Sequence, residues 1–209
     1  MIINDVNSLM RWKTSPLPAG YYRLNWVQKI NPTTNVYVNT GIIPTWTTRV
    51  IIKGTNSSDV TTAGMLFGSR NGTNFGRYWA VTWNGYYDVG FGANHNTQIT
   101  PVTANTDFEI DFNSDSNHTM TVNGISTTVT ENTSYPEYPM FIFRLNQAGS
   151  LNNQKANNFK LKEFEVFSNY TTPILHYIPI MKDDMSEMYL YDVVNKEFEA
   201  LSLTYYTYG

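Results

Sequence analysis

The sequence predicts an all-β protein in which two antiparallel sheets stack as a jelly-roll β-sandwich, preceded by a short N-terminal arm. Three observations lead to this fold. From Tyr21 onward, short runs rich in Thr, Val, Ile and aromatic residues recur about every ten residues. Two Asn-Gly pairs stand between such runs, and a helical period is almost absent. Without crossover helices so many strands cannot form a parallel sheet, and we expect them to stack as a sandwich rather than close a barrel.

Residues 1–19 differ from the rest of the chain and form the first predicted element, a helical or extended arm. Asn4 or Asp5 can cap a short helix that has one apolar face. The Pro-rich stretch at residues 16–20 ends this helix, because proline cannot continue it, and links the arm to a domain at residues 20–209. Such an arm has too little apolar surface to order itself, so we expect it to anchor the protein to a partner. Its expected contact residues are Val6, Leu9, Met10 and Trp12.

The strands of the domain follow from runs of β-branched and aromatic residues bounded by turn residues. Ten of them are expected at residues 22–29, 36–40, 47–53, 64–69, 97–102, 108–112, 140–145, 159–167, 174–180 and 188–192. Four more flank the two Asn-Gly pairs, which gives about fourteen strands in one domain. Gly90 and Gly92 lie inside the strand pattern and indicate bulges that curve the sheets.

Two tight hairpins are predicted at Asn84-Gly85 and Asn123-Gly124. A type I′ turn needs positive φ at both central positions, which Asn and Gly tolerate. The first pair joins residues 78–83 to 86–89, and the second joins 119–122 to 125–129. Before the second turn, apolar residues alternate with threonines, which is typical of a strand with one face in water.

The composition excludes several classes of protein. The chain has 209 residues, of which 41% are hydrophobic, and this suits one large β domain and rules out disorder. With 14 Lys and Arg against 17 Asp and Glu the net charge is −3, so no nucleic-acid partner is expected. The chain has no Cys and therefore no disulfide or thiolate zinc site. Its longest apolar runs are far shorter than the roughly 20 residues that cross a bilayer, so no membrane insertion is expected.

Several segments follow one another in an order known from one family. They are residues 37–41 before a Pro-Thr turn, residues 66–70, the strand and Asn-Gly turn at 118–124, and residues 140–146 and 159–167. The end of the chain adds Ile178-Pro179-Ile180, Leu190-Tyr191-Asp192 and Asn195-Lys196-Glu197-Phe198. Over residues 21–209 the chain resembles the laminin-G-like branch of the concanavalin A-like lectin and glucanase superfamily, in the form common in phage and bacterial surface proteins. The resemblance implies two curved sheets used mainly to bind glycans or proteins, and it does not imply catalysis.

The best candidate for a catalytic motif is the alternating triplet Asp107, Glu109 and Asp111, which shares one strand face. It resembles the glucanase arrangement of the superfamily, in which the two outer carboxylates act as nucleophile and acid/base. Here both outer residues are Asp, and they lie about 13 Å apart along a strand, whereas a retaining pair needs about 5–5.5 Å. We therefore expect a solvated strand face and no enzyme, with a glycoside hydrolase as the alternative.

No cofactor is predicted. His95, His118 and His176 lack the spacing of metal ligands, so a zinc site is not expected, and surface positions are favoured for the first two. The carboxylates and hydroxyl of residues 183–187 could offer oxygen ligands to calcium, but the Asp and Gly spacing of a calcium loop is missing.

Aromatic residues near turns are the best candidates for a binding site. A sugar presents C–H faces together with hydroxyls, so its site needs an exposed Trp or Tyr beside Asn, Asp or Gln. Residues 83–88 supply this mixture, whereas Trp79 is expected in the core. The glycan candidates are Trp46, Trp83, Tyr86, Tyr87, Asn94 and His95. The tyrosines Tyr205, Tyr206 and Tyr208 form a run too aromatic for a free tail, and we expect them to contact a partner chain or the arm.

These features favour a non-enzymatic, lectin-like protein with a structural or adhesive role. We predict a phage virion surface component, in the head or a tail fibre, that contacts other virion proteins through its arm, forms an oligomer and binds host-surface glycan. Low charge and the lack of Cys and of a secretory signal agree with this role. The first alternative is a bacterial carbohydrate-binding module, extracellular or on the cell surface. A glucanase-like hydrolase and a purely structural spacer follow.

Overall fold

The computed structural model describes residues 17–30, 35–61, 64–72, 76–92, 96–129, 134–152 and 159–209. The predictions made for Val6, Leu9, Met10, Trp12, Asn94 and His95 lie outside these ranges. The described residues form strands joined by turns and loops, without a helix. Accordingly, none of the described segments is a helix long and apolar enough to span a membrane.

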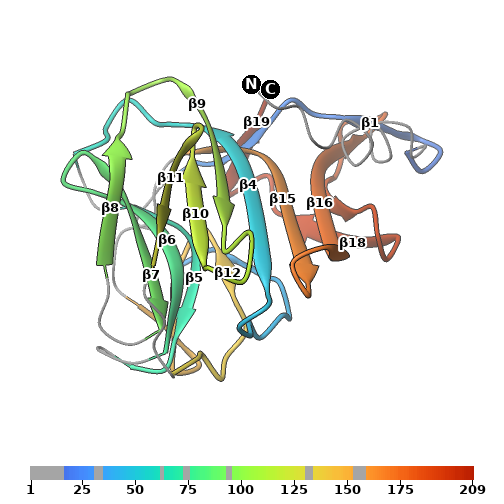
Figure 1. The fold of residues 1–209 in the computed structure, drawn as a ribbon. Helices are drawn as coiled ribbons and strands as arrows, with labels where there is room; N and C mark the ends of the chain where they lie inside the picture. The colour runs from blue at the N-terminus through green and yellow to red at the C-terminus, as the bar shows by residue number, and fades with distance from the viewer. Residues whose placement is uncertain are drawn as a thin grey trace.

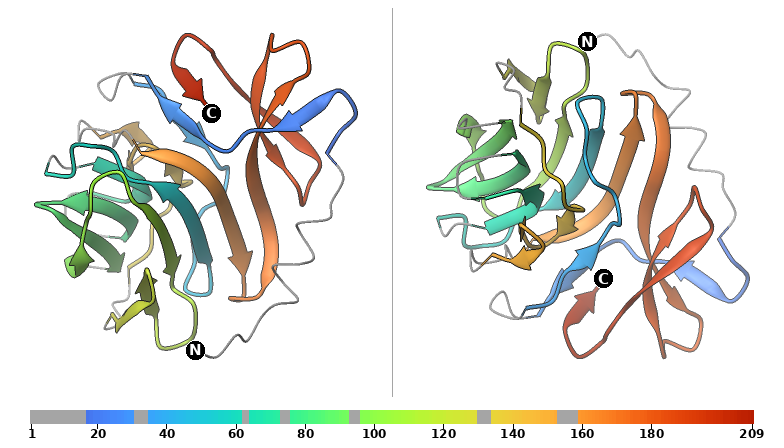
Figure 2. Two further views of the ribbon diagram at one scale, coloured as in Figure 1. Left: turned by 90° about the horizontal axis from the view of Figure 1, so that it is seen from above. Right: turned by 90° about the horizontal axis from the view of Figure 1, so that it is seen from below.

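The strands form two stacked sheets, as predicted (Figures 1 and 2). The larger sheet contains β1 (Tyr21–Arg23), β2 (Val27–Lys29), β4 (Arg49–Thr55), β9 (Asp107–Phe112), β10 (Thr119–Val122), β11 (Ile125–Thr128), β15 (Lys160–Ser168), β16 (Thr172–Lys182), β17 (Met188–Asp192), β18 (Glu197–Leu201) and β19 (Tyr206–Tyr208). The smaller sheet contains β3 (Val38–Asn39), β5 (Gly64–Arg70), β6 (Arg77–Trp83), β7 (Tyr86–Gly92), β8 (Asn96–Pro101), β12 (Phe141–Ile142), β13 (Asn146–Gln147) and β14 (Ser150–Leu151). Paired strands run antiparallel, apart from β13, which runs parallel to β5. The fold is thus an all-β sandwich compatible with a jelly roll.

Both predicted Asn-Gly hairpins are confirmed. Asn84 and Gly85 have φ angles of 51° and 79°, and Asn123 and Gly124 have φ angles of 50° and 81°. These are the positive values that a two-residue type I′ turn requires. The first turn joins β6 to β7 and the second joins β10 to β11. Each turn fixes which residues lie directly opposite one another on the two strands that it joins.

Two predicted strands are interrupted. The segment predicted at residues 22–29 divides into β1, which pairs with β16, and β2, which pairs with β15 and β19. Between them the backbone N–H of Leu24 donates to Pro179, whereas that of Asn25 donates to the carbonyl of Gly209. The segment predicted at residues 140–145 narrows to β12, because Phe143 has a φ of 67° and cannot continue an extended strand.

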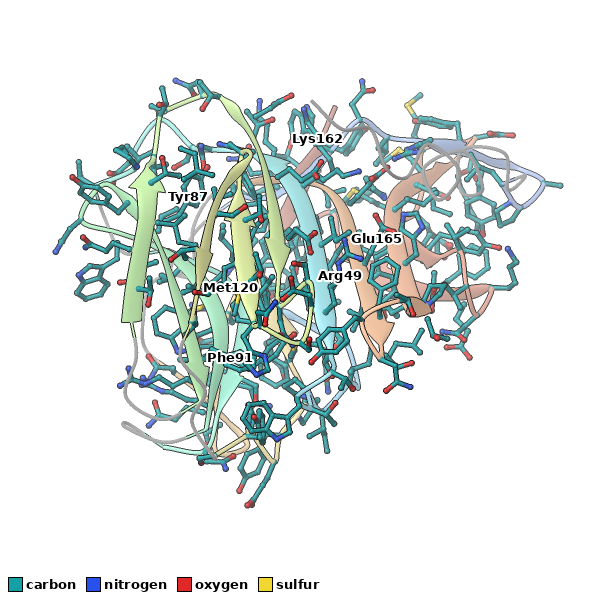
Figure 3. All side chains as sticks on the ribbon, in the orientation of Figure 1. Arg49, Tyr87, Phe91, Met120, Lys162 and Glu165 are labelled. Atoms are coloured by element: carbon teal, nitrogen blue, oxygen red, sulfur yellow. The ribbon has the colours of Figure 1, made fainter. Side chains whose placement is uncertain are left out.

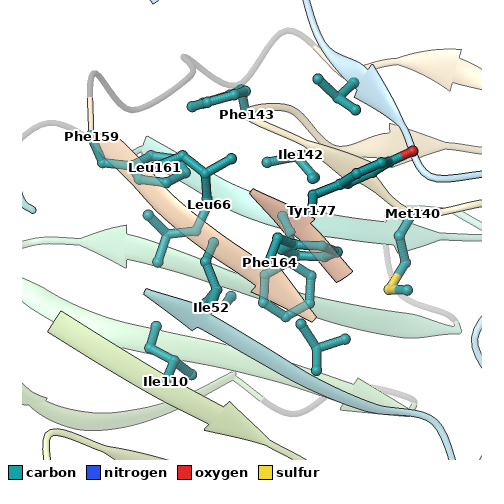
Figure 4. Packing of buried hydrophobic residues seen from close by; sticks show 14 of the residues in the cluster. Ile52, Leu66, Ile110, Met140, Ile142, Phe143, Phe159, Leu161, Phe164 and Tyr177 are labelled. Carbon is teal, nitrogen blue, oxygen red and sulfur yellow. The ribbon is translucent and has the colours of Figure 1, made fainter. Parts of the chain in front are cut away.

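The core lies between the two sheets and is largely aromatic. Tyr87, Phe91 and Met120 come from both sheets and point into the space between them (Figure 3). The ring of Phe67 on the smaller sheet lies 5.6 Å from that of Phe164 on the larger sheet. Figure 4 shows aliphatic side chains, such as Ile52 and Leu66, packed near the ring of Phe164. Fully burying such a side chain contributes about 1.5–3 kcal/mol, so this core is the main source of stability in a chain without Cys.

The C-terminal tyrosines are attached to the chain itself. β19 pairs with β2, and the Gly209 carbonyl accepts hydrogen bonds from the backbone of Asn25 and Trp26. Tyr206 is buried, with its ring 5.8 Å from that of Phe143. The ring of Tyr206 thus completes the core of its own chain, whereas a contact with a partner chain or the arm was expected. Tyr205 and Tyr208 are exposed.

Candidate functional site

The outer face of the smaller sheet carries the candidate site. Along β6 the side chains alternate, so that Tyr78 points into the core while Trp79 joins a separate buried cluster on the other side of the sheet. Residues directly opposite each other on paired strands share a face, and Trp83 lies opposite Tyr86. We call this surface the β6–β7 face and define it by Arg70, Arg77, Trp79, Trp83, Tyr86 and Asp88.

Two exposed aromatic rings lie at the turn end of the β6–β7 face. Trp83 ends β6 and Tyr86 begins β7, and each is 40% exposed. The turn holds them directly opposite each other, at positions whose Cβ atoms lie about 4.5–5.5 Å apart. The structure thus brings two of the predicted glycan candidates together as one apolar surface. A pair of exposed rings suits the C–H face of a sugar.

A buried carboxylate lies beside the aromatic pair. Asp88 follows Tyr86 by two residues, so both side chains leave the same side of β7. Asp88 is 4% exposed, and its Oδ1 has no hydrogen-bond partner within the described ranges. Burial raises the pKa of Asp88 to about 6, although the positive charge of Arg77 opposes the rise. Because buried polar groups are normally hydrogen-bonded, this carboxylate has accepting capacity left for ligand hydroxyls.

On the same face, Trp79 provides a hydrogen-bond donor, whereas Asp88 provides an acceptor. Trp79 is buried, but in the cluster on the outer side of the smaller sheet and not in the core between the sheets where it was expected. Its indole lies against Gly90, where an added Cβ would stand 2.3 Å from a ring atom. The glycine therefore makes room for the ring. The Nε1–H of Trp79 is buried without an acceptor, so it is a donor whose hydrogen bond the described part of the chain does not supply.

The other end of the β6–β7 face is basic. Arg70 ends β5 and Arg77 begins β6, and the two lie directly opposite each other. Arg70 donates from Nη2 to Oε1 of Gln147 at 2.7 Å. Burial lowers the pKa of Arg70, and the charge of Arg77 lowers it further. Like charges at opposed positions destabilise a sheet, so the fold holds an unfavourable contact here.

Two other predicted glycan candidates do not lie on an open surface. Tyr87 is 1% exposed, and its hydroxyl donates to Oδ1 of Asn56 in the core at 2.9 Å. Trp46 is half-buried and packs on the core, with its ring 4.2 Å from that of Tyr135. The structure corrects the prediction for Tyr87, because nearness to a turn in sequence does not decide which way a side chain points. Trp46 is only partly buried, and its role in glycan binding stays a prediction. On β7, the two-residue period sends Tyr86 outward and Tyr87 inward.

His118 is buried as well, whereas a surface position was expected. Its ring stacks with that of Trp46 at 5.0 Å, and its Nδ1 lies 2.8 Å from Oδ1 of Asn113. These contacts assign His118 to the packing between the sheets. It is not part of a surface site.

The outer face of the larger sheet carries ion pairs between neighbouring strands. Arg49 on β4 makes a two-point contact with Asp111 on β9, with Nε–Oδ1 and Nη2–Oδ2 distances of 2.8 and 2.7 Å. Lys53, farther along β4, lies 3.9 Å from the carboxylate of Glu109. The register of β4 and β9 places Lys53 directly opposite Glu109. Two of the three carboxylates in the suspected catalytic triplet therefore face a cation.

The third carboxylate of the triplet, that of Asp107, also pairs with a cation. Lys162 on β15 lies 2.6 Å from Oδ2 of Asp107, and the Thr55 hydroxyl donates to Oδ1 at 2.6 Å. These hydrogen bonds hold the pKa of Asp107 below its ordinary value. An acid of this kind stays ionised at neutral pH and cannot deliver a proton to a leaving group.

Three possible metal ligands meet on this same face. Glu165 lies directly opposite His176, and the ligand atoms of Glu163, Glu165 and His176 lie within 4.8 Å of one another (Figure 3 labels Glu165). Spacing along the sequence gave no sign of the cluster, because strand pairing creates it. The two oxygens of Glu163 already bind Arg23 at 2.5 Å and Lys53 at 3.1 Å. We therefore assign the cluster to the ion-pair network.

Burial governs the titration of this cluster. It raises the pKa of Glu165 to about 7, although Lys53 opposes the rise. It also lowers the pKa of His176 to about 4. For Glu163 burial acts upward, but Lys53 and Arg23 outweigh it and the pKa is lowered. At neutral pH, Glu163 thus carries the negative charge that the neighbouring cations require.

The residues considered for calcium use their oxygens within the chain. Oδ1 of Asp184 accepts hydrogen bonds from the backbone and the hydroxyl of Ser186, at 3.0 and 2.5 Å. Glu187 pairs with Lys182 at 2.8 Å. These contacts stabilise the turn between β16 and β17. Whether its remaining oxygens bind calcium is not tested.

No family model matches the sequence, and no curated protein matches it. Solved structures share the fold. A protein from Bacteroides ovatus, described as a "putative carbohydrate binding protein", superposes with a TM-score of 0.51 at 13% identity, over 87% of this chain and 61% of that one. A mutant of NanB sialidase from Streptococcus pneumoniae gives a TM-score of 0.49 at 16% identity, over 73% of this chain and 27% of that one. This chain thus spans less than two thirds of either protein, and at such identity the first likeness shows a shared β-sandwich fold alone.

Sequence reasoning missed the polar part of the β6–β7 face. The sequence did carry one signal for Asp88: it follows Tyr86 by two residues, and residues two apart on a strand share a face. The pair of Arg70 and Arg77 was harder to predict, because it depends on the register of β5 against β6, which shifts between Met65 and Phe67.

Proposed function

We propose that this protein is a non-catalytic carbohydrate-binding β-sandwich and that the β6–β7 face is its glycan site. The observation that carries the proposal is the exposed pair of Trp83 and Tyr86 beside the buried carboxylate of Asp88, whose Oδ1 has no hydrogen-bond partner. The rings would stack on the C–H face of a sugar, and the carboxylate would accept hydrogen bonds from its hydroxyls.

The similarity of fold supports this class of function. The Bacteroides ovatus protein that shares the sandwich is described as binding carbohydrate. A carbohydrate-binding module therefore agrees with the findings better than the virion surface component expected from the sequence, for which no finding offers support. A position outside the cell or on its surface, where glycans are abundant, is part of the proposal.

The absence of catalysis is also a proposal, and it rests on charge pairing. Asp107, Glu109 and Asp111 each pair with a Lys or Arg on another strand of the same sheet. A glycosidase needs one carboxylic acid with a raised pKa within reach of a second, ionised carboxylate. This triplet is arranged to stabilise the sheet instead.

A glycan array probed with the full chain, followed by calorimetric titration of the best ligand, tests the proposed function. We expect Trp83→Ala and Tyr86→Ala each to weaken binding at least tenfold, because each removes half of the stacking surface. The matched control is Ile125→Ala, which removes an apolar side chain that is 52% exposed on the larger sheet. Unchanged affinity in both aromatic variants would place the site elsewhere, and release of reducing sugar by the wild-type chain would show catalysis.

A further inference from the structure

The basic end of the β6–β7 face indicates the chemical class of the ligand. Arg70 and Arg77 lie directly opposite each other in the pairing of β5 and β6. Their charges repel, and partial burial reduces the screening that water would provide. The sheet therefore holds two cations together at a cost in stability. An anion bound between the two guanidinium groups would reduce this cost.

Arg70 has no acidic partner among the described residues. The six salt bridges of the described part of the chain lie in the larger sheet or at its β16–β17 turn. The side chain of Arg70 bonds to the neutral amide of Gln147, and its Nε is buried without an acceptor. Arg77 differs, because it is near enough to Asp88 to oppose the rise in the pKa of that carboxyl. Among the described residues of this face, Arg70 is thus the cation without an acidic partner.

The basic end is continuous with the aromatic end. Trp79 follows Arg77 by two residues on the same side of β6, and Trp83 follows after four more. Six residues of strand span about 20 Å. A ligand that reaches from the arginines to the exposed rings is therefore elongated, and its path crosses the part of the face where Trp79 and Asp88 are buried.

We propose that the glycan bound by this face bears a carboxylate and that the carboxylate binds the guanidinium of Arg70; the inference rests on the proposed function. A guanidinium offers a carboxylate two parallel N–H···O bonds, which a neutral sugar cannot accept in the same way. A bound anion would also relieve the repulsion between Arg70 and Arg77. Acidic sugars, rather than neutral ones, are then the preferred ligands.

The test presents the full chain with an array of carboxylate-bearing, sulfated and neutral glycans. The best carboxylate ligand and its methyl ester are then compared by calorimetric titration, since esterification removes the charge and leaves the sugar ring. We expect the acid to bind at least tenfold more tightly than the ester. Arg70→Gln should abolish this preference, and Arg70→Lys should keep a part of it, because Lys retains the charge without the planar fork.

Arg23→Gln is the matched control, because it removes one positive charge from the larger sheet, where Arg23 pairs with Glu163. It should leave the ratio of acid to ester affinity unchanged. Equal binding of acid and ester by the wild-type chain overturns the inference even if an Arg70 variant fails to fold, and it leaves the proposed function standing. Preference for sulfated glycans overturns the assignment to a carboxylate. Failure to bind any glycan overturns the proposed function itself.

Discussion

The two outer faces of the sandwich differ in how their charged side chains are paired. On the larger sheet, the carboxylates of β9 pair with cations on β4 and β15, and Arg49 makes two hydrogen bonds with Asp111. On the smaller sheet, Arg70 faces Arg77, and the buried Asp88 keeps an oxygen without a hydrogen bond. The first face satisfies its polar groups within the chain. On the second face, Arg70 and Asp88 each keep a buried polar atom that finds no hydrogen-bond partner among the described residues, and two aromatic rings are exposed.

This difference separates a stabilising surface from a binding surface. Exposed ion pairs contribute little individually, but a face that is neutralised in register has no charge left to attract a ligand. An unsatisfied buried group raises the free energy of the folded chain until some partner supplies the missing bond. A comparison of the two faces therefore identifies the binding surface more securely than a count of acidic residues, which pointed first to residues 107–111.

The largest expected effect comes from the buried ring of the β6–β7 face. Trp79→Ala removes an indole packed against Met65, Val81 and Leu145, and we expect it to lower the free energy of unfolding by about 3–5 kcal/mol. Chemical denaturation monitored by circular dichroism measures the loss. Trp83→Ala, at an exposed position on the same strand, is the control and should change stability by less than about 0.5 kcal/mol. An equal loss of stability in both variants would mean that Trp83 is packed as tightly as Trp79 and is not available to a ligand.

A smaller effect is expected on the opposite face. Asp111→Asn breaks the two-point contact with Arg49, in which both side chains are partly buried, and should lower the free energy of unfolding by about 1–2 kcal/mol. Glycan affinity should not change, because the substitution lies on the other side of the sandwich. A loss of affinity without a loss of stability would contradict the division of roles between the faces.

The buried carboxylate of the β6–β7 face should make stability depend on pH. The pKa of Asp88 is about 6 in the folded chain, because of burial, and about 3.9 in an unfolded one. The folded state thus binds the proton more tightly, so the contribution of Asp88 to stability is present below about pH 4 and is lost as the pH rises to about 6. Asp88→Asn should remove this dependence and raise the free energy of unfolding at pH 7 by up to about 3 kcal/mol, since each pKa unit corresponds to about 1.4 kcal/mol.

The difference between wild type and Asp88→Asn across pH 4–7 isolates this group. Glu165 and His176 also have shifted pKa values, but they contribute equally to both proteins. Parallel stability curves for the two proteins would show that the carboxyl of Asp88 is not perturbed. The same variant should bind glycan more weakly, because the amide replaces an ionised acceptor.

Local patterns in the sequence were sufficient to predict the sandwich and its hairpins. The period of two in β4 and β9 and the two Asn-Gly turns are determined by neighbouring residues, so no distant contact can mask them. Whether a residue at the end of a strand is buried cannot be predicted from its neighbours in sequence alone. Tyr86 and Tyr87 are identical in type and adjacent in sequence, and which of them faces the core depends on the register of β7.

The polar part of the site depended on tertiary structure still more. Arg70 and Arg77 become neighbours through the pairing of β5 with β6, and Glu165 meets His176 through that of β15 with β16. The sequence shows residue types, but it does not show which charges find a partner. The resemblance to lectins and glucanases predicted the architecture and could not indicate which face binds.

The smallest expected effect tests the hydrolase alternative. Asp107 is the most exposed member of the triplet, with a side chain that is 70% exposed, and its pair with Lys162 is open to solvent and salt. We expect Asp107→Asn to change the free energy of unfolding by less than about 0.5 kcal/mol. Because Lys162 and Thr55 hold the pKa of Asp107 down, the wild-type carboxyl is ionised at neutral pH and cannot act as a general acid. Wild type and variant should therefore release equal, background amounts of reducing sugar from the glycans that the chain binds. Activity in the wild type that is lost in Asp107→Asn would make the larger sheet a catalytic face and reverse the assignment of the two surfaces.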